Sequence, residues 1–250
     1  MTDPPANSID CASVRKWFDK QPAKVRVPLL ILFDKCVPVR HRGVRLDLID
    51  DEYRHVVVEV IDSLFTRQQR GLFLAGEIGV GKTSTLYVIL KSILTGHYLL
   101  KLQTKDEDVE SLDEFEIENI MGGLKHFFVS VTHFELVRQL REYYGAFNRS
   151  DREPDVVTRP LVFIDDLGRG YDDQSGWNLA LLDEYFDRRW QNHQPVFVTT
   201  NKKPEELRTW PTWGRIIDRL CDPIWMRKVW ISGRSKRTRE FVEQQKGGDE

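Results

Sequence analysis

The sequence predicts an α/β fold, in which a mostly parallel five-stranded sheet lies between two layers of helices. Short apolar runs alternate along the chain with segments of helical periodicity, as in parallel strands joined by crossover helices. A glycine-rich loop joins the first of these apolar runs to its helix, and two acidic residues end the third. The 250 residues, 40% of them hydrophobic, can build one large domain, with at most a small appendage.

The predicted elements follow one another at regular intervals. A first helix is expected over 51–69, because apolar residues recur there at helical spacing after two aspartates. Strands are expected at 72–75, 127–131, 161–164, 196–199 and 229–231. The helices that connect or follow them are expected at 82–94, 134–144, 177–190 and 215–220.

The division of the chain follows from composition and charge. Residues 51–240 are expected to form the main domain, 1–50 a short lead-in or partner-binding segment, and 241–250 a disordered tail. Residues 106–118 carry eight acidic side chains and no basic one. We interpret them as a solvated surface insertion, with a partner-binding or DNA-mimicking segment as the alternative. The net charge of −2 excludes a uniformly basic, histone-like surface.

Cysteine usage and the amino terminus indicate the compartment. Cys11, Cys36 and Cys221 are far apart and form no metal-binding pattern, which favours a reducing environment. The first ten residues are polar and lack the apolar core of a signal peptide. The apolar run 28–33 is too short to cross a bilayer, which takes about 20 residues. We therefore expect a soluble, cytoplasmic protein without a membrane partner.

The glycine-rich loop fits the phosphate-binding pattern G-x-x-x-x-G-K-[ST] in full, between an apolar strand and a helix. Its glycines let backbone N–H groups turn toward a phosphate, and the helix that follows points its positive end at the same place. Lys82 is expected to reach the β- and γ-phosphates, and Thr83 to bind Mg²⁺. The loop consists of Gly76, Glu77, Ile78, Gly79, Val80, Gly81, Lys82 and Thr83.

Two carboxylates directly follow the apolar run 161–164. A continuous apolar run indicates a strand buried on both faces, and the carboxyl ends of such strands border the ligand crevice of open α/β sheets. Asp165 is therefore expected to hold Mg²⁺ through water, and Asp166 to polarise the water that attacks the γ-phosphate. Charges at this place would be costly without a cation, which favours a metal–nucleotide site.

Other polar residues complete the predicted site. Asn201 directly follows the run 196–200 and would orient the attacking water if its strand lies beside that of the acidic pair. By itself, this asparagine would be interpreted as the start of a turn before Pro204. Arg215 and Arg219 lie one helical turn apart, where they form either a surface helix paired with Asp218 or arginines that reach a neighbouring subunit's γ-phosphate.

Taken in order, the P-loop, the run IDDLG, TTN, RIIDRL and SGRSKR resemble the AAA+ ATPases of the DnaC/IstB type, the bacterial helicase loaders and transposition helper ATPases. The resemblance covers about residues 36–240, and the stretch 36–42 is similar to the short lead-in of that family. It implies a P-loop NTPase fold of the AAA+/ASCE class, with three α/β/α layers and little or no C-terminal lid.

The resemblance also implies roles for individual residues. ATP and Mg²⁺ are the expected cofactors, with Ser84 added to the P-loop contacts and with Thr83 and Asp165 as metal ligands. Asp165 and Asp166 would form the Walker B motif, and Asn201 would be sensor 1. The arginine finger would be Arg219, with Arg215 as second choice, and sensor 2 would be Arg237, with Arg234 as its rival.

The partners implied are a replicative DNA helicase, single-stranded DNA and further copies of the chain in an ATP-dependent oligomer. The expected DNA contacts lie on the helix 134–144, which either binds DNA or packs as an ordinary amphipathic helix: Arg138, Arg141, Tyr143 and Tyr144. The leading hypothesis is a slow, partner-stimulated ATPase that loads a helicase. The alternatives are an IstB-like helper that delivers a transposase, a P-loop kinase, and a nucleotide-dependent interaction module without hydrolysis.

Overall fold

The computed structural model describes residues 37–41, 44, 49–64, 69–104, 126–144, 153–169, 176–210 and 213–233. Most of the lead-in, the acidic segment 106–118, the tail 241–250 and the candidate arginines Arg234 and Arg237 lie outside these residues. The chain divides into two compact units. One combines 1–69 with 84–128, and the other combines 70–83 with 129–250.

Where the structure describes the first unit, it shows two longer helices and one short one. The 3-10 helix η1 spans Val39–His41, α3 spans Asp51–Leu64, and α4 begins at Lys82 in the second unit and ends at Thr104 in the first. Helix α3 starts where expected, and residues 65–68 of its predicted range lie outside the described residues. Helix α4 is ten residues longer, because the helix-forming run after Gly96 continues it.

The lead-in contacts the first turns of α4 within this unit. The Nδ1 atom of His41 lies 3.1 Å from the Ser84 hydroxyl oxygen, and the His41 ring stacks on Tyr87 with centroids 5.0 Å apart. The hydroxyls of Tyr53 and Thr85 lie 3.5 Å apart, which joins α3 to α4. These contacts involve the residues that directly follow the P-loop.

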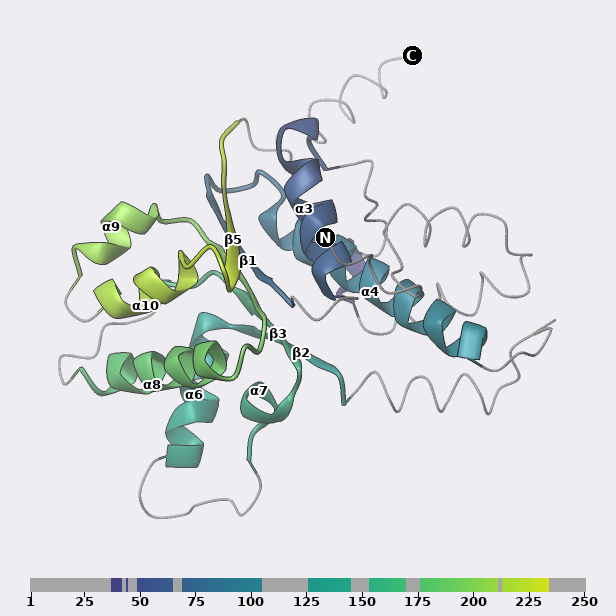
Figure 1. The fold of residues 1–250 in the computed structure, drawn as a ribbon. Coiled ribbons are helices and arrows are strands. Elements are labelled where there is room, and N and C mark those ends of the chain that lie inside the picture. Colours follow the sequence, from purple (N-terminus) through teal and green to yellow (C-terminus); the bar gives the residue numbers. More distant parts are fainter. Residues whose placement is uncertain are drawn as a thin grey trace, which may run out of the picture. The chain divides into compact units, whose positions relative to one another are not determined.

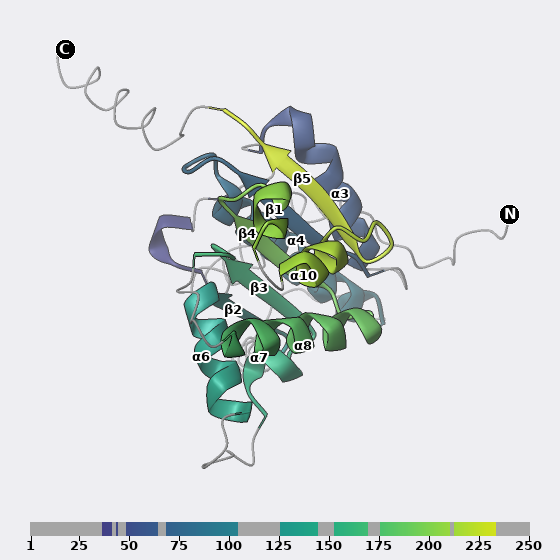
Figure 2. The same cartoon turned by 90° about the vertical axis from the view of Figure 1, so that its left-hand side faces the viewer.

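The second unit is built on the predicted five-stranded sheet, with strand order β2-β3-β4-β1-β5 (Figure 2). The sheet is all-parallel, as the residue register shows for β1 with β4, β1 with β5, and β3 with β4. All five predicted strands are confirmed, and β5 begins three residues earlier than expected. Their bounds are Gly71–Gly76 for β1, Phe128–Thr132 for β2, Leu161–Asp165 for β3, Val196–Thr200 for β4 and Met226–Ile231 for β5.

Burial of the strands agrees with their apolar patterns. The inner strands β1 and β4 are buried along their whole length, whereas the edge strand β5 alternates between buried and exposed residues. Pairing of Ile164 with Val198 places the ends of β3 and β4 side by side, and pairing of Leu74 with Thr199 brings β1 next to them. Three of the predicted site segments therefore begin at one edge of the sheet.

Helices α6, α8 and α10 pack against one another in this unit, and α6 and α10 also contact the sheet (Figure 2). They bury a core that includes Phe73, Leu140, Phe186 and Trp213. The short helices α7 and α9 were not predicted; α9 forms because Pro204 fits the first turn of a helix. The helix bounds are His133–Tyr144 for α6, Asp155–Thr158 for α7, Trp177–Gln191 for α8, Pro204–Arg208 for α9 and Trp213–Leu220 for α10.

Arg189, near the end of α8, is buried with only 2% of its surface exposed. Its guanidinium donates to four backbone carbonyls near the beginnings of β3 and β4, at 2.8–3.4 Å: those of Val156, Arg159, Pro160 and Pro195. Burial lowers the pKa of Arg189, while its ring neighbour Tyr185 counteracts that shift. The contacts satisfy carbonyl groups that would otherwise be buried at the strand entrances without donors.

No helix within the described residues is both long and apolar enough to cross a lipid bilayer.

Candidate nucleotide-binding site

The loop between β1 and α4 has the backbone of a phosphate-binding turn. Gly79 and Gly81 adopt φ angles of 84° and 98°, a conformation that side chains disfavour and that the glycines permit. The backbone N–H of Glu77 donates to Ile231 at the end of β5 over 3.3 Å, which fixes the start of the loop to the sheet. Val80 is buried, whereas the Ile78 side chain at the tip is exposed.

Lys82 lies beneath this loop, with 6% of its surface exposed. Its Nζ atom donates to the carbonyl oxygens of Gly76 and Glu77 over 2.9 and 2.6 Å, and to Oδ1 of Asn201 over 2.7 Å. An ammonium group has three N–H donors, and three acceptors surround this one. The structure therefore brings the predicted P-loop lysine and the predicted sensor 1 residue into direct contact.

The two predicted metal ligands are also in contact. The hydroxyl of Thr83 donates to Oδ1 of Asp165 over 2.9 Å, and the hydroxyl of Thr199 donates to the same oxygen over 2.5 Å. Hydroxyl and carboxylate oxygens are ligands that suit Mg²⁺. In phosphate sites, a few protein ligands hold this ion together with the phosphate oxygens. Among the described residues no group of three His, Cys, Asp or Glu side chains could hold a metal alone.

Asp166 lies just past the end of β3 with a φ angle of 55°, a left-handed conformation that aspartate tolerates better than most residues. Its backbone N–H donates to the Thr199 hydroxyl over 2.9 Å. Its Oδ1 accepts from the amide of Asn201 over 2.9 Å, and its Oδ2 accepts from Arg169 over 3.0 Å. The predicted role of Asn201 required its strand to lie beside that of the acidic pair, and β3 and β4 are indeed neighbours.

Sequence reasoning missed two participants, Thr199 and Arg169. Thr199 stands one residue before the end of β4, and the two threonines that follow three apolar residues in this strand were a usable signal. Arg169 reaches back to Asp166 through a tight turn, in which its N–H donates to the Asp166 carbonyl over 3.1 Å. An exposed arginine in a glycine-rich loop carries no such signal, because its partner depends on the turn geometry.

The two candidate trans-acting arginines pair with α8 rather than with the P-loop or the acidic pair. Arg219 donates to Oδ1 of Asp183 over 2.5 Å and also to Asp187, and Arg215 lies 3.2 Å from the other oxygen of Asp183. The alternative interpretation, in which Asp218 pairs with these arginines, does not hold. That carboxylate faces α9 instead and accepts from Arg208 over 3.0 Å.

The predicted DNA-contact residues on α6 divide into two groups. The tyrosines are half-buried: Tyr143 donates to Glu153 over 3.0 Å, a bond that raises the pKa of Tyr143, and Tyr144 packs against the core and raises the pKa of Arg188 through a hydrogen bond. Arg138 and Arg141 are exposed, although Arg138 pairs with Glu142 over 3.1 Å.

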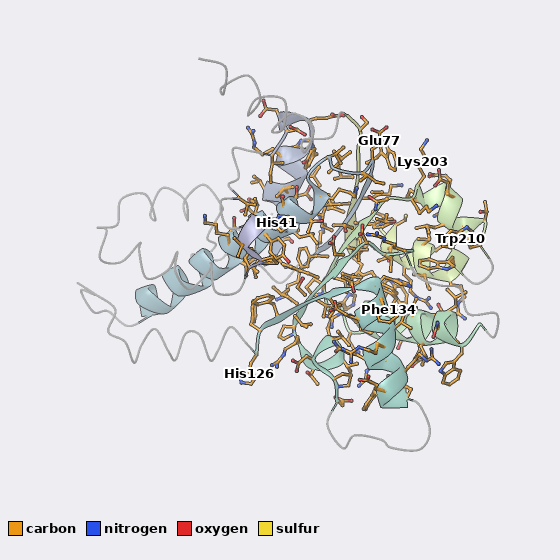
Figure 3. The ribbon with its side chains drawn as sticks, turned by 180° about the vertical axis from the view of Figure 1, so that it is seen from behind. His41, Glu77, His126, Phe134, Lys203 and Trp210 are labelled. Atoms are coloured by element: carbon orange, nitrogen blue, oxygen red, sulfur yellow. The ribbon has the colours of Figure 1, made fainter. Side chains whose placement is uncertain are left out.

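An exposed aromatic side chain lies on the same helix. Phe134, labelled at the start of α6 in Figure 3, has 71% of its surface exposed. The spacing of Phe134, Arg138 and Arg141 places all three on one helix face. We call these three residues the α6 stripe.

Four features define the fold class: an all-parallel sheet with this strand order, a P-loop after β1, an acidic pair at the end of β3 and a polar residue after β4. The chain has the α/β fold of P-loop AAA+ proteins. Solved structures agree. It matches DnaI with a TM-score of 0.53 and 19% identity, over 80% of this chain and 94% of that one.

The DnaC helicase loader matches with a TM-score of 0.52 and 16% identity, over 78% of this chain and 99% of that one. A protein described as a primosome component from Streptococcus pyogenes serotype M3 matches with a TM-score of 0.52 and 18% identity, over 82% and 98%. At such identities the likeness concerns the fold. No family model and no curated protein matches the sequence.

Proposed function

We propose that this chain is an ATP-binding and ATP-hydrolysing AAA+ protein of DNA replication that acts on a replicative helicase as a loader. The observation that carries the nucleotide part is the chain of contacts from Lys82 through Asn201 to Asp166, beside the contact of Thr83 with Asp165. These are the groups that P-loop chemistry needs, and the fold places them at the carboxyl ends of β1, β3 and β4.

Each residue has a role in this proposal. The N–H groups of the P-loop and the ammonium of Lys82 bind the β- and γ-phosphates, which requires Lys82 to exchange its present acceptors for phosphate oxygens. Thr83 and Asp165 hold Mg²⁺, which would neutralise charge on the phosphates. Asp166 accepts a hydrogen bond from the attacking water, and Asn201 orients that water.

The arginines of α10 extend the proposal to an assembly. Arg219, with Arg215 as second candidate, acts on the nucleotide of a neighbouring copy, because an arginine there stabilises the negative charge of the transition state. ATP would thereby favour self-association, and hydrolysis would reverse it. Arg237, or Arg234, is proposed to contact the nucleotide within the subunit.

Single-stranded DNA is the proposed nucleic-acid partner, and the α6 stripe is its proposed contact. Phe134 offers a face on which a base can stack, and Arg138 and Arg141 offer charges for the backbone. Replacing both arginines with alanine should weaken binding of a labelled oligonucleotide and flatten its salt dependence. An unchanged slope would place the DNA contact elsewhere.

Nucleotide binding is tested with Lys82→Ala, which removes the ammonium from beneath the loop. We expect loss of ATP binding in a filter assay; retained affinity would contradict the P-loop assignment. The partner is tested by a pull-down with an ATP analogue present. Recovery of a replicative helicase supports the loader, because the DnaC helicase loader shares this fold, whereas recovery of a transposase supports the transposition helper instead.

A further inference from the structure

Helices α8 and α10 lie side by side (Figure 1). They share a cluster of four charged side chains. Asp183 and Asp187 are one helical turn apart on α8, and Arg215 and Arg219 are one turn apart on α10. We call these four residues the α8–α10 charge cluster. Its two positive and two negative charges balance, so the cluster carries no net charge.

The two arginines of the cluster differ in what holds them. Arg219 donates from both terminal nitrogens, one to Asp183 and one to Asp187, and only 12% of its side chain is exposed. Arg215 makes one contact, with Asp183, and 72% of its side chain is exposed. The arginine that matches the trans-acting position is therefore the one that its own subunit holds more firmly.

We propose that Asp183 and Asp187 are positioning residues that hold Arg219 against α8 in the free subunit, so that a neighbour's triphosphate must compete with them for its guanidinium. The proposal rests on the proposed function, because it takes Arg219 as the residue that acts on a neighbouring nucleotide. A γ-phosphate with its several charged oxygens can replace two carboxylates as a partner, whereas a diphosphate at the same site lacks that group. Assembly would then depend on the triphosphate rather than on nucleotide in general.

The first test needs no ATP. A dicarbonyl reagent modifies exposed arginines, and mass spectrometry locates the modified residues. In the wild-type protein we expect Arg215 to react and Arg219 to be protected. In Asp187→Asn, which removes one of the two carboxylates that contact Arg219 and leaves Arg215 its own partner, Arg219 should react several times faster. Equal reactivity of Arg215 and Arg219 in the wild type would overturn the proposal.

The second test measures ATP turnover per subunit against protein concentration. Asp187→Asn should reach half-maximal turnover at a concentration about three- to tenfold lower, since one ion pair less opposes release of Arg219. Asp187→Glu keeps the charge and should resemble the wild type. The matched control is Asp218→Asn, which removes the same charge from α10 but only from a contact with Arg208; it should not shift the curve.

Two results would contradict the proposal in this assay. Turnover of Asp187→Asn that falls at saturating protein concentration would show that the carboxylates hold Arg219 in its active position. A shift that persists when Arg219→Ala is added would show that Asp187 acts through another residue. Failure of the proposed function is recognised separately, because a wild-type protein without ATP turnover refutes the ATPase assignment even where the arginine footprint is as expected.

Discussion

Replacing Asn201 with alanine tests the centre of the candidate site. The side chain accepts from Lys82 over 2.7 Å and donates to Asp166 over 2.9 Å, so it is the one neutral group between two opposite charges. A hydrogen bond to a charged group contributes about 1.5–3 kcal/mol. Asn201→Ala removes two, but Lys82 keeps two carbonyl acceptors and Asp166 keeps Arg169, so the net loss of unfolding free energy should be about 1–2 kcal/mol.

The effect on catalysis should be larger than the effect on stability. Without the amide, Oδ1 of Asp166 loses its hydrogen bond from Asn201, and loss of one oriented hydrogen-bonding group typically costs about 10²–10³ in turnover. We expect turnover about 100-fold lower, with ATP affinity changed less than about threefold, because the P-loop remains intact.

Steady-state ATP hydrolysis gives kcat and KM for this variant, and urea unfolding gives its stability. The matched control is Asn192→Ala, which removes an exposed asparagine at the end of α8 that bonds only to the Arg188 carbonyl. That control should lose little in either assay. Turnover of Asn201→Ala within twofold of the wild type would refute the role of Asn201.

Three further predictions concern charged groups. Arg169→Ala should lower kcat about two- to fivefold at constant KM, because Asp166 loses an exposed ion pair. Arg169→Lys should restore most of the lost kcat, and a change in KM alone would contradict this prediction. Arg189→Met should cost about 3–5 kcal/mol in urea unfolding, since four buried carbonyls lose their donor; a loss under 1 kcal/mol would show that water replaces it. The hydrogen bond from Trp190 lowers the pKa of Asp222, so its contribution to stability is present above the ordinary carboxyl pKa of about 3.9 and is lost as pH falls through the lowered value. Asp222→Asn should therefore be less stable than the wild type at pH 7, and this difference should shrink as the pH falls below the ordinary carboxyl pKa; a difference that does not change with pH would exclude the carboxylate.

The candidate site could be predicted from the sequence because its residues occupy fixed places relative to strand ends. Lys82 follows a glycine-rich turn, Asp166 directly follows one buried strand, and Asn201 follows another. Parallel strands bring such ends to one edge whatever the details of packing. The missing information was which strands are neighbours, and the pairing of β3 with β4 supplies it.

The contacts between helices could not be predicted in the same way. That Arg219 faces Asp183 and Asp187, and not the adjacent Asp218, depends on how α10 is rotated against α8. The hydrogen-bond partner of Tyr143 is Glu153, ten residues further along the chain. Helical periodicity gives the faces of one helix, but the partner of each face is set by tertiary packing.

The buried position of Arg189 has a consequence for motion in the assembly. Its four carbonyl partners fasten the last turn of α8 to the sheet, two residues after Asp187. Helix α8 is therefore the stationary side of the α8–α10 charge cluster. A displacement that frees Arg219 is therefore expected from its own side chain or from α10, rather than from α8. A probe attached to α10, rather than to α8, would report the arrival of a neighbouring subunit.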